Sequence, residues 1–168
     1  MKDVNPKYWI NPRDKPGLLL ALMKELLGDA SISFEGRLNG LGFEKIPGAK
    51  TEETEGLKRV AIDPKLGFVV LPLNKESVPE IWKIIAEKDH LTNEEGIIHV
   101  QIEKNGELVF GGYDNFHKDC VVAYAGIPIE LLQVLKERGI IRVFQKASDT
   151  QHRWHDCKKG RSRTKENP

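Results

Sequence analysis

The sequence of 168 residues is poor in the features that mark secreted and membrane proteins. Its two cysteines, Cys120 and Cys157, are too few for the disulfide framework of a small secreted domain. No apolar run approaches the roughly 20 residues that a membrane-spanning helix needs. Residues 1–16 are polar and lack the apolar core of a secretory signal peptide. We therefore expect a cytoplasmic protein with no membrane association.

Recognisable catalytic motifs are also absent. The sequence has no glycine-rich phosphate-binding signature, no nucleophile elbow around a serine and no paired-histidine metal motif. We therefore predict no catalytic residue, no resident metal and no cofactor, and the sequence favours a protein that is not an enzyme.

The net charge of +1 hides an uneven distribution. Residues 151–168 carry six Lys or Arg against two acidic residues, a net charge of +4, whereas the rest of the chain is at −3. After Trp154 this stretch has no large apolar residue to offset the entropy of ordering a chain. We predict one domain over 1–147 and a basic, disordered tail over 148–168. Such a tail either aids solubility or contacts the phosphates of a nucleic acid.

Apolar residues recur with helical or strand periodicity along most of the chain. Helices are expected to begin at Asp14, Ser77 and Pro128, with Ser77-Val78-Pro79-Glu80 as a capping box. Strands are expected at 7–10, 30–34, 60–63, 67–73, 98–103, 108–110, 120–124 and 140–144. Strands and helices are intermixed, which indicates an α+β fold: a mostly antiparallel sheet with about three helices packed on it. The first six elements have the order of a ferredoxin-like βαββαβ core.

Three local patterns lead to finer expectations. The apolar run Phe68-Val69-Val70-Leu71 is typical of a central strand. Residues 37–57 are a long loop whose first half packs on the body and whose second half, with the run 51–55, is solvated. A three-residue turn, Lys104-Asn105-Gly106 with a bulge, would make Ile102 face Leu108 and Val100 face Phe110.

The run Asp14-Lys15-Pro16-Gly17-Leu18-Leu19, followed by an amphipathic helix and a strand, resembles the opening of ACT domains. These are ferredoxin-like regulatory modules that often bind amino acids. The resemblance covers about 25 residues. It implies that Asp14 and Gly17 line a small-molecule site, because the turn glycine of the family lets the backbone approach a ligand. The same letters also make a generic helix start.

A second candidate site follows the pair Gly111-Gly112. Tyr113, Asp114, Asn115, Phe116 and His117 offer aromatic and polar groups on a loop, and such groups are typical of binding surfaces. His117 lies three residues before Cys120, so a reactive thiolate is an alternative interpretation. A cysteine directly before two valines more often packs as a small apolar residue.

His117, Cys120, His152, His155 and Cys157 together supply more than the four donors that tetrahedral zinc needs. Neither half has the spacing of a standard zinc knuckle, and the competing interpretation is a set of solvated histidines.

These observations favour a non-catalytic binding protein that acts through protein–protein contact, as an inhibitor, an immunity-type protein or a regulatory partner. Its contact surfaces would be the loops 37–57 and 111–119 and the tail. One alternative is a domain that senses an amino-acid-like small molecule at Asp14 and Gly17. The other is a cysteine- or zinc-dependent enzyme around His117 and Cys120.

Overall fold

The structure is a computed structural model that describes residues 5–87, 90–91 and 96–149. Seven strands and three α-helices lie within these residues. In chain order they are β1 (Tyr8–Pro12), α1 (Lys15–Glu25), β2 (Ala30–Gly36), β3 (Gly67–Pro72), α2 (Ser77–Ala86), β4 (Ile97–Lys104), β5 (Glu107–Gly112), β6 (Val121–Ala123), α3 (Ile129–Glu137) and β7 (Ile141–Lys146). Short 3-10 helices, η1 and η2, span Phe43–Lys45 and Ala147–Asp149.

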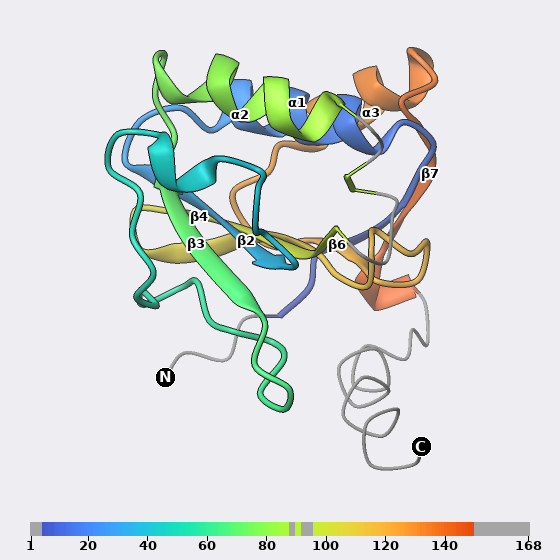
Figure 1. Cartoon of the computed structure of the whole chain (residues 1–168). Coiled ribbons are helices and arrows are strands. Elements are labelled where there is room, and N and C mark those ends of the chain that lie inside the picture. Colours follow the sequence, from blue (N-terminus) through green and yellow to red (C-terminus); the bar gives the residue numbers. More distant parts are fainter. Residues whose placement is uncertain (1–4, 88–89, 92–95, 150–168) are drawn as a thin grey trace.

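The strands form one sheet in the order β3-β2-β4-β5-β6-β1-β7, and every strand pairing in it is antiparallel. The three helices lie over one face of this sheet (Figure 1). The predicted α+β class is therefore confirmed, with an antiparallel sheet and three helices. Within the described ranges, no helix has the length and apolar character to cross a bilayer.

The ferredoxin-like core is not confirmed by these pairings. β2, β3 and β4 are neighbours, but β1 is separated from β4 by β5 and β6 and pairs instead with β6 and β7. The sheet is also larger than a four-stranded core. The predicted tail lies almost wholly outside the described residues: β7 ends at Lys146, η2 follows, and the description stops at residue 149.

The helix-side core follows the predicted apolar faces. Leu18, Leu19 and Leu22 of α1 are fully buried, as are Ile81 and Ile85 of α2. Burying such a side chain contributes about 1.5–3 kcal/mol each, which is the main reason that these helices stay on the sheet.

The helix starts differ in how well the sequence predicted them. Asp14 is the N-cap of α1, as expected, and its Oδ1 accepts from the Gly17 N–H at 2.9 Å. The capping box at Ser77 is wrong. Ser77 is already helical and its hydroxyl donates to the Pro72 carbonyl at 2.6 Å, while Asn74 Oδ1 accepts from the backbone N–H groups of Glu76 and Ser77.

The β4–β5 hairpin is also closed differently from the prediction. Lys104 pairs with Glu107 around a two-residue turn, Asn105-Gly106, in which both residues have positive φ. A bulge lies farther along, where Ile102 pairs with Phe110 and Glu103 with Leu108. Ile102 therefore faces Phe110 and not Leu108, and Val100 faces Gly112 and not Phe110, while Leu108 packs on the other face of the sheet with Leu57 and Phe68. The turn keeps the common Asn-Gly geometry.

Residues 50–66, which we call the strap, pass around the β3 edge and beneath the second face of the sheet (Figure 1). The predicted strand at 60–63 is wrong, because these residues have no strand pairing. The expectation of a solvated second half holds for Thr51, Glu52, Glu53 and Glu55, which are exposed, but not for Thr54 and Leu57. Leu57 is fully buried with Phe68 and Val70, and Thr54 donates to Glu103 at 2.8 Å.

Three polar side chains of the sheet hold the strap. Glu35 accepts from the N–H groups of Val60 and Ala61 at 2.8 and 2.9 Å. Gln101 donates to the Lys58 carbonyl at 2.6 Å, and Glu103 also accepts from the Gly56 N–H at 3.0 Å. Irregular buried backbone needs such partners, because an unpaired N–H away from water costs about as much as a lost hydrogen bond.

The strap also explains why the apolar run at Phe68–Leu71 misled the sequence argument. β3 is an edge strand, not a central one. Its open edge is covered by the strap, since Lys50 and Val70 exchange two backbone hydrogen bonds of 2.8 and 3.0 Å. Helices cover one side of β3 and the strap covers the other, so its residues are as apolar as those of a central strand.

We expect Glu35→Gln to lower the free energy of unfolding by about 1–3 kcal/mol, because an amide places a donor against one of two buried N–H groups. Glu53→Gln is the matched control: Glu53 accepts from the Arg59 N–H at 2.6 Å but is exposed, so its loss should stay within about 0.5 kcal/mol. Urea unfolding measures both. Equal small losses would show that Glu35 does not hold the strap.

Candidate functional site

The structure brings the two predicted site regions together. Lys15, in the first turn of α1, donates from Nζ to the Asn115 carbonyl at 2.7 Å. Burial lowers the pKa of Lys15, and the nearby Asp114 carboxylate opposes that shift. We call Asp14, Lys15, Asp114, Asn115 and His117 the rim: Asp14, Asp114 and His117 are exposed, and Lys15 and Asn115 are partly exposed.

A left-handed turn presents the β5–β6 part of the rim. Asp114, Asn115 and Phe116 have φ of 56°, 56° and 57°, three successive non-glycine residues in the left-handed region. This conformation costs roughly 1–2 kcal/mol per residue for L-amino acids. Such strain persists only where the surroundings impose it, and it clusters at functional sites.

The contacts that impose the turn come from β4 and from α1. Asn115 is held through both its backbone and its side chain. Its backbone N–H donates to the Ile98 carbonyl and its side-chain amide donates to the Ile97 carbonyl, both at 2.8 Å. The His117 N–H closes the turn on the Asp114 carbonyl at 3.1 Å. Together with the Lys15 contact, these bonds make the turn a rigid feature of the surface.

Two of the predicted contact residues are buried. Phe116 and Tyr113 are 1% and 2% exposed, so neither ring is available to a partner and this part of the prediction does not match the geometry. Their rings explain the Gly111-Gly112 pair. A Cβ on Gly112 would meet the Phe116 ring at 2.6 Å, and one on Gly111 would meet the Tyr113 ring at 2.5 Å. The glycines serve packing, with one aromatic ring on each face of the sheet.

Asp14 and Gly17 also have a local structural role. The Asp14 carboxylate caps the first turn of α1, and a Cβ on Gly17 would collide with that carboxylate. The space next to the glycine is therefore filled by the cap, and not left open for a ligand as the ACT resemblance implies.

Beneath the turn, the second face of the sheet holds a polar cluster that sequence reasoning missed. The Tyr113 and Tyr124 side chains are buried together, and the Tyr113 ring lies 5.8 Å from that of His99. Nδ1 of His99 accepts from the Asp114 N–H at 3.3 Å, which joins the cluster to the rim. His99 is itself buried, at 1% exposed. In the sequence, the pair Gly111-Gly112 was the only signal for this polar cluster.

The His117 and Cys120 side chains diverge. His117 is exposed, and its Nδ1 accepts from the Asp119 N–H at 3.2 Å. Cys120 is buried beside Tyr113 and Val122, and it is disulfide-bonded, so it carries no free thiol. Cys157 lies outside the described residues. This geometry gives no support to a cysteine nucleophile activated by His117.

The proposed zinc ligands are not brought together in the part of the chain that the structure describes. No three metal-ligating side chains converge among those residues. His152, His155 and Cys157 lie outside them, as does the basic stretch proposed to contact nucleic acid.

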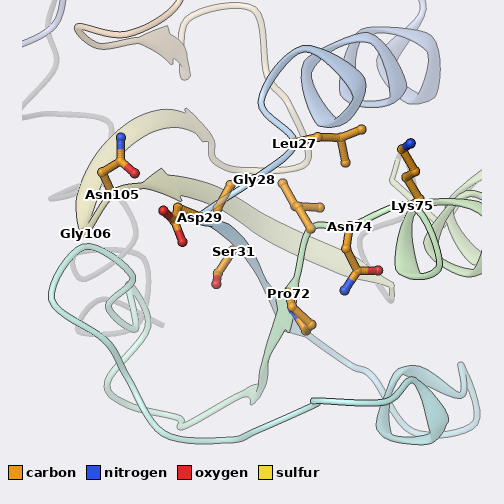
Figure 2. Close-up of a pocket in the computed structure, with 11 residues that line it drawn as sticks. Leu27, Gly28, Asp29, Ser31, Pro72, Asn74, Lys75, Asn105 and Gly106 are labelled. Atoms are coloured by element: carbon orange, nitrogen blue, oxygen red, sulfur yellow. The ribbon is translucent and has the colours of Figure 1, made fainter.

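A second surface feature lies at the opposite end of the strands. Three connections line a hollow of about 820 Å³: the α1–β2 loop, the β3–α2 loop and the Asn105-Gly106 turn (Figure 2). Asp29 lies on one side of the hollow and Lys75 on the other (Figure 2). Lys104, next to the Asn105-Gly106 turn, donates to the carbonyl of Leu27 in the lining at 3.0 Å.

No protein-family model, curated protein or solved structure matches this chain. The resemblance to the opening of ACT domains therefore stays an untested prediction. Function has to be argued from the rim, the polar cluster and the hollow themselves.

The buried tyrosines predict a pH dependence. Burial raises the pKa of Tyr113 and of Tyr124 well above the ordinary value of about 10. Below about pH 10 both the folded and the unfolded chain keep these protons, so the two tyrosines cause no pH dependence there. Above it only the unfolded chain releases them, and the free energy of unfolding should fall as pH rises.

Urea unfolding between about pH 8 and pH 11 measures this fall. Tyr124→Phe and Tyr113→Phe each remove one of the two protons, so both variants should show a shallower fall than the unchanged chain. If the free energy of unfolding falls as steeply with pH in both variants as in the unchanged chain, the pH dependence does not come from the two buried tyrosines.

Proposed function

We propose that this chain is a non-catalytic binding protein that recognises a protein partner through the rim. The observation that carries the proposal is the left-handed turn at Asp114–Phe116, where three successive residues are strained and yet anchored. The turn leaves Asp114 exposed and His117 exposed beside it. A surface already held in one conformation loses little entropy on binding, which favours affinity for a partner.

The charges of the rim suit recognition of a protein surface. The Asp114 carboxylate lies near the Lys15 ammonium group, and the exposed Asp14 and His117 add a second carboxylate and a polar ring to the rim. Complementary charges at an interface steer association and select partners more than they add affinity. This is the behaviour that an inhibitor, an immunity-type protein or a regulatory partner needs.

The test is affinity capture from the native cell with the immobilised chain, followed by a titration with the protein retained in stoichiometric amount. Asp114→Asn removes the charge with a residue that tolerates the left-handed region. We expect it to weaken binding about tenfold. Glu44→Gln, an exposed carboxylate on η1 near β3, is the matched control and should bind like the unchanged chain.

Two outcomes would contradict the proposal. One is that no protein is retained in stoichiometric amount. The other is that Asp114→Asn and Glu44→Gln bind equally well. For location, we propose the cytoplasm, as the sequence predicts; a disulfide at Cys120 that persists in the native cell would argue for an oxidising compartment instead.

The hollow supports a second candidate, recognition of an amino-acid-like small molecule. A zwitterion needs a cation and an anion on separate sides of one site, and Lys75 and Asp29 lie in that relation around the hollow. Asn105 and Ser31 add further hydrogen-bonding groups. This candidate keeps the ligand class that the ACT resemblance implies but moves the site to the other end of α1.

A thermal-shift series with the twenty amino acids tests this candidate. A ligand at one hundred times its Kd should stabilise the chain by about 2.7 kcal/mol, and the shift should vanish in Lys75→Met. Lys83→Met, an exposed lysine of α2 paired with Glu80, is the control. A series in which no amino acid raises the melting temperature would exclude the hollow as such a site.

A further inference from the structure

The two edges of the sheet are treated differently. The strap covers β3 at one edge, through the hydrogen-bond pair between Lys50 and Val70. At the other edge, β7 pairs only with β1 among the described residues. Figure 1 shows β7 at the side of the sheet away from the strap. An uncovered edge strand is a template for the addition of another strand.

The register defines which groups of β7 face outward. The Ala147 N–H donates to the Lys7 carbonyl at 2.9 Å, and Tyr8 is opposite Lys146. In an antiparallel ladder, bonding alternates along the strand. Gln145 therefore directs its N–H and carbonyl to β1, whereas Phe144 and Lys146 direct theirs away from the sheet.

The side chains along this edge carry charge of one sign. Residues 138–146, Arg-Gly-Ile-Ile-Arg-Val-Phe-Gln-Lys, contain three basic residues and no acidic one. Arg138, Arg142 and Lys146 are all exposed, and Val143, also on the strand, is 38% exposed. The edge therefore combines open backbone groups, an apolar contact and positive charge.

The same charges disfavour a second copy of this chain as the occupant. An antiparallel pairing of two β7 strands about Phe144 would place Arg142 of one copy opposite Lys146 of the other. Like charges directly opposite are destabilising in a sheet. A strand with acidic side chains would meet the same positions with opposite charge.

We propose that β7 is a docking edge for an extended, acidic segment of a protein partner, which adds to the sheet as an eighth strand. The backbone of the segment would bond to Phe144 and Lys146, and its carboxylates would lie next to Arg142 and Lys146. This proposal uses a different surface from the rim, and either can fail without the other.

Amide hydrogen exchange of the free chain is the first test. The N–H groups of Val143 and Gln145 should exchange slowly, because they bond to β1, and those of Phe144 and Lys146 should exchange rapidly. Slow exchange at Phe144 and Lys146 in the free chain would overturn the proposal, because the edge would already be covered.

The second test titrates the full chain with a synthetic Glu-Val-Glu-Val-Glu-Val peptide at up to millimolar concentration and follows the backbone amides by NMR. We expect saturable shifts centred on residues 142–146, and slower exchange at Phe144 and Lys146. A Lys-Val peptide of equal length and an N-methylated Glu-Val peptide should give none. Shifts with the Lys-Val peptide, or none with the Glu-Val peptide, would overturn the proposal.

Two variants separate the backbone from the charge. Lys146→Ala removes a charge and keeps the outward N–H, so binding should weaken a few-fold and become less dependent on salt. Lys146→Pro removes the N–H as well, at a position where the β1 ladder does not use it, and binding should be lost. If the proline variant does not fold, the N-methylated peptide still decides the point. Equal binding of the Glu-Val peptide by the unchanged chain, Lys146→Ala and Lys146→Pro would overturn the proposal.

Discussion

The hydrogen bonds between the polar side chains of β2 and β4 and the backbone of the strap are the constraint on which the second face of the sheet depends. Glu35 alone accepts two buried backbone N–H groups, at 2.8 and 2.9 Å. Without such acceptors, an irregular segment would have to stay in water. With them, the strap covers Phe68 and Val70, closes the β3 edge, and gives the sheet a second layer in place of solvent.

That second layer, with the anchored turn beside it, separates the interior of the molecule from its contact surfaces. Under it, Tyr113 and Tyr124 lie together in a buried cluster. Above the cluster, the Asp114–Phe116 turn holds exposed charge in a fixed position. One sheet edge is closed by the strap, and at the other edge, among the described residues, β7 pairs only with β1 and carries exposed basic side chains.

Where the sequence argument failed, the outcome depended on the geometry of specific contacts that the residue pattern does not record. The Ser77 capping box has the right letters, but Asn74 takes the capping role because the Ser77 hydroxyl bonds to Pro72 at the end of β3. In the hairpin, the turn and the facing pairs were both predicted wrongly. A bulge between Ile102 and Glu103 keeps the Asn-Gly turn, sets Phe110 opposite Ile102 and leaves Leu108 on the other face of the sheet. In the sequence, Phe116 and Tyr113 are aromatic residues of a loop. In the structure their rings are buried, because Gly112 and Gly111 leave space for them.

The sequence by itself determined the helices, most strands, the α+β class and the Asp14 cap, because these depend on periodicity and on neighbours within a few residues. It also identified Asp14, Asp114, Asn115 and His117 of the rim as candidate binding residues, but not Lys15. Only the tertiary structure decided that these residues meet across the Lys15–Asn115 bond, that His99 is buried, and that, among the described residues, the strap covers the edge of β3 whereas β7 pairs only with β1. The physical reason is that alternation along a strand reports one buried face. Whether the other face meets water or a distant strap depends on partners that no local pattern records.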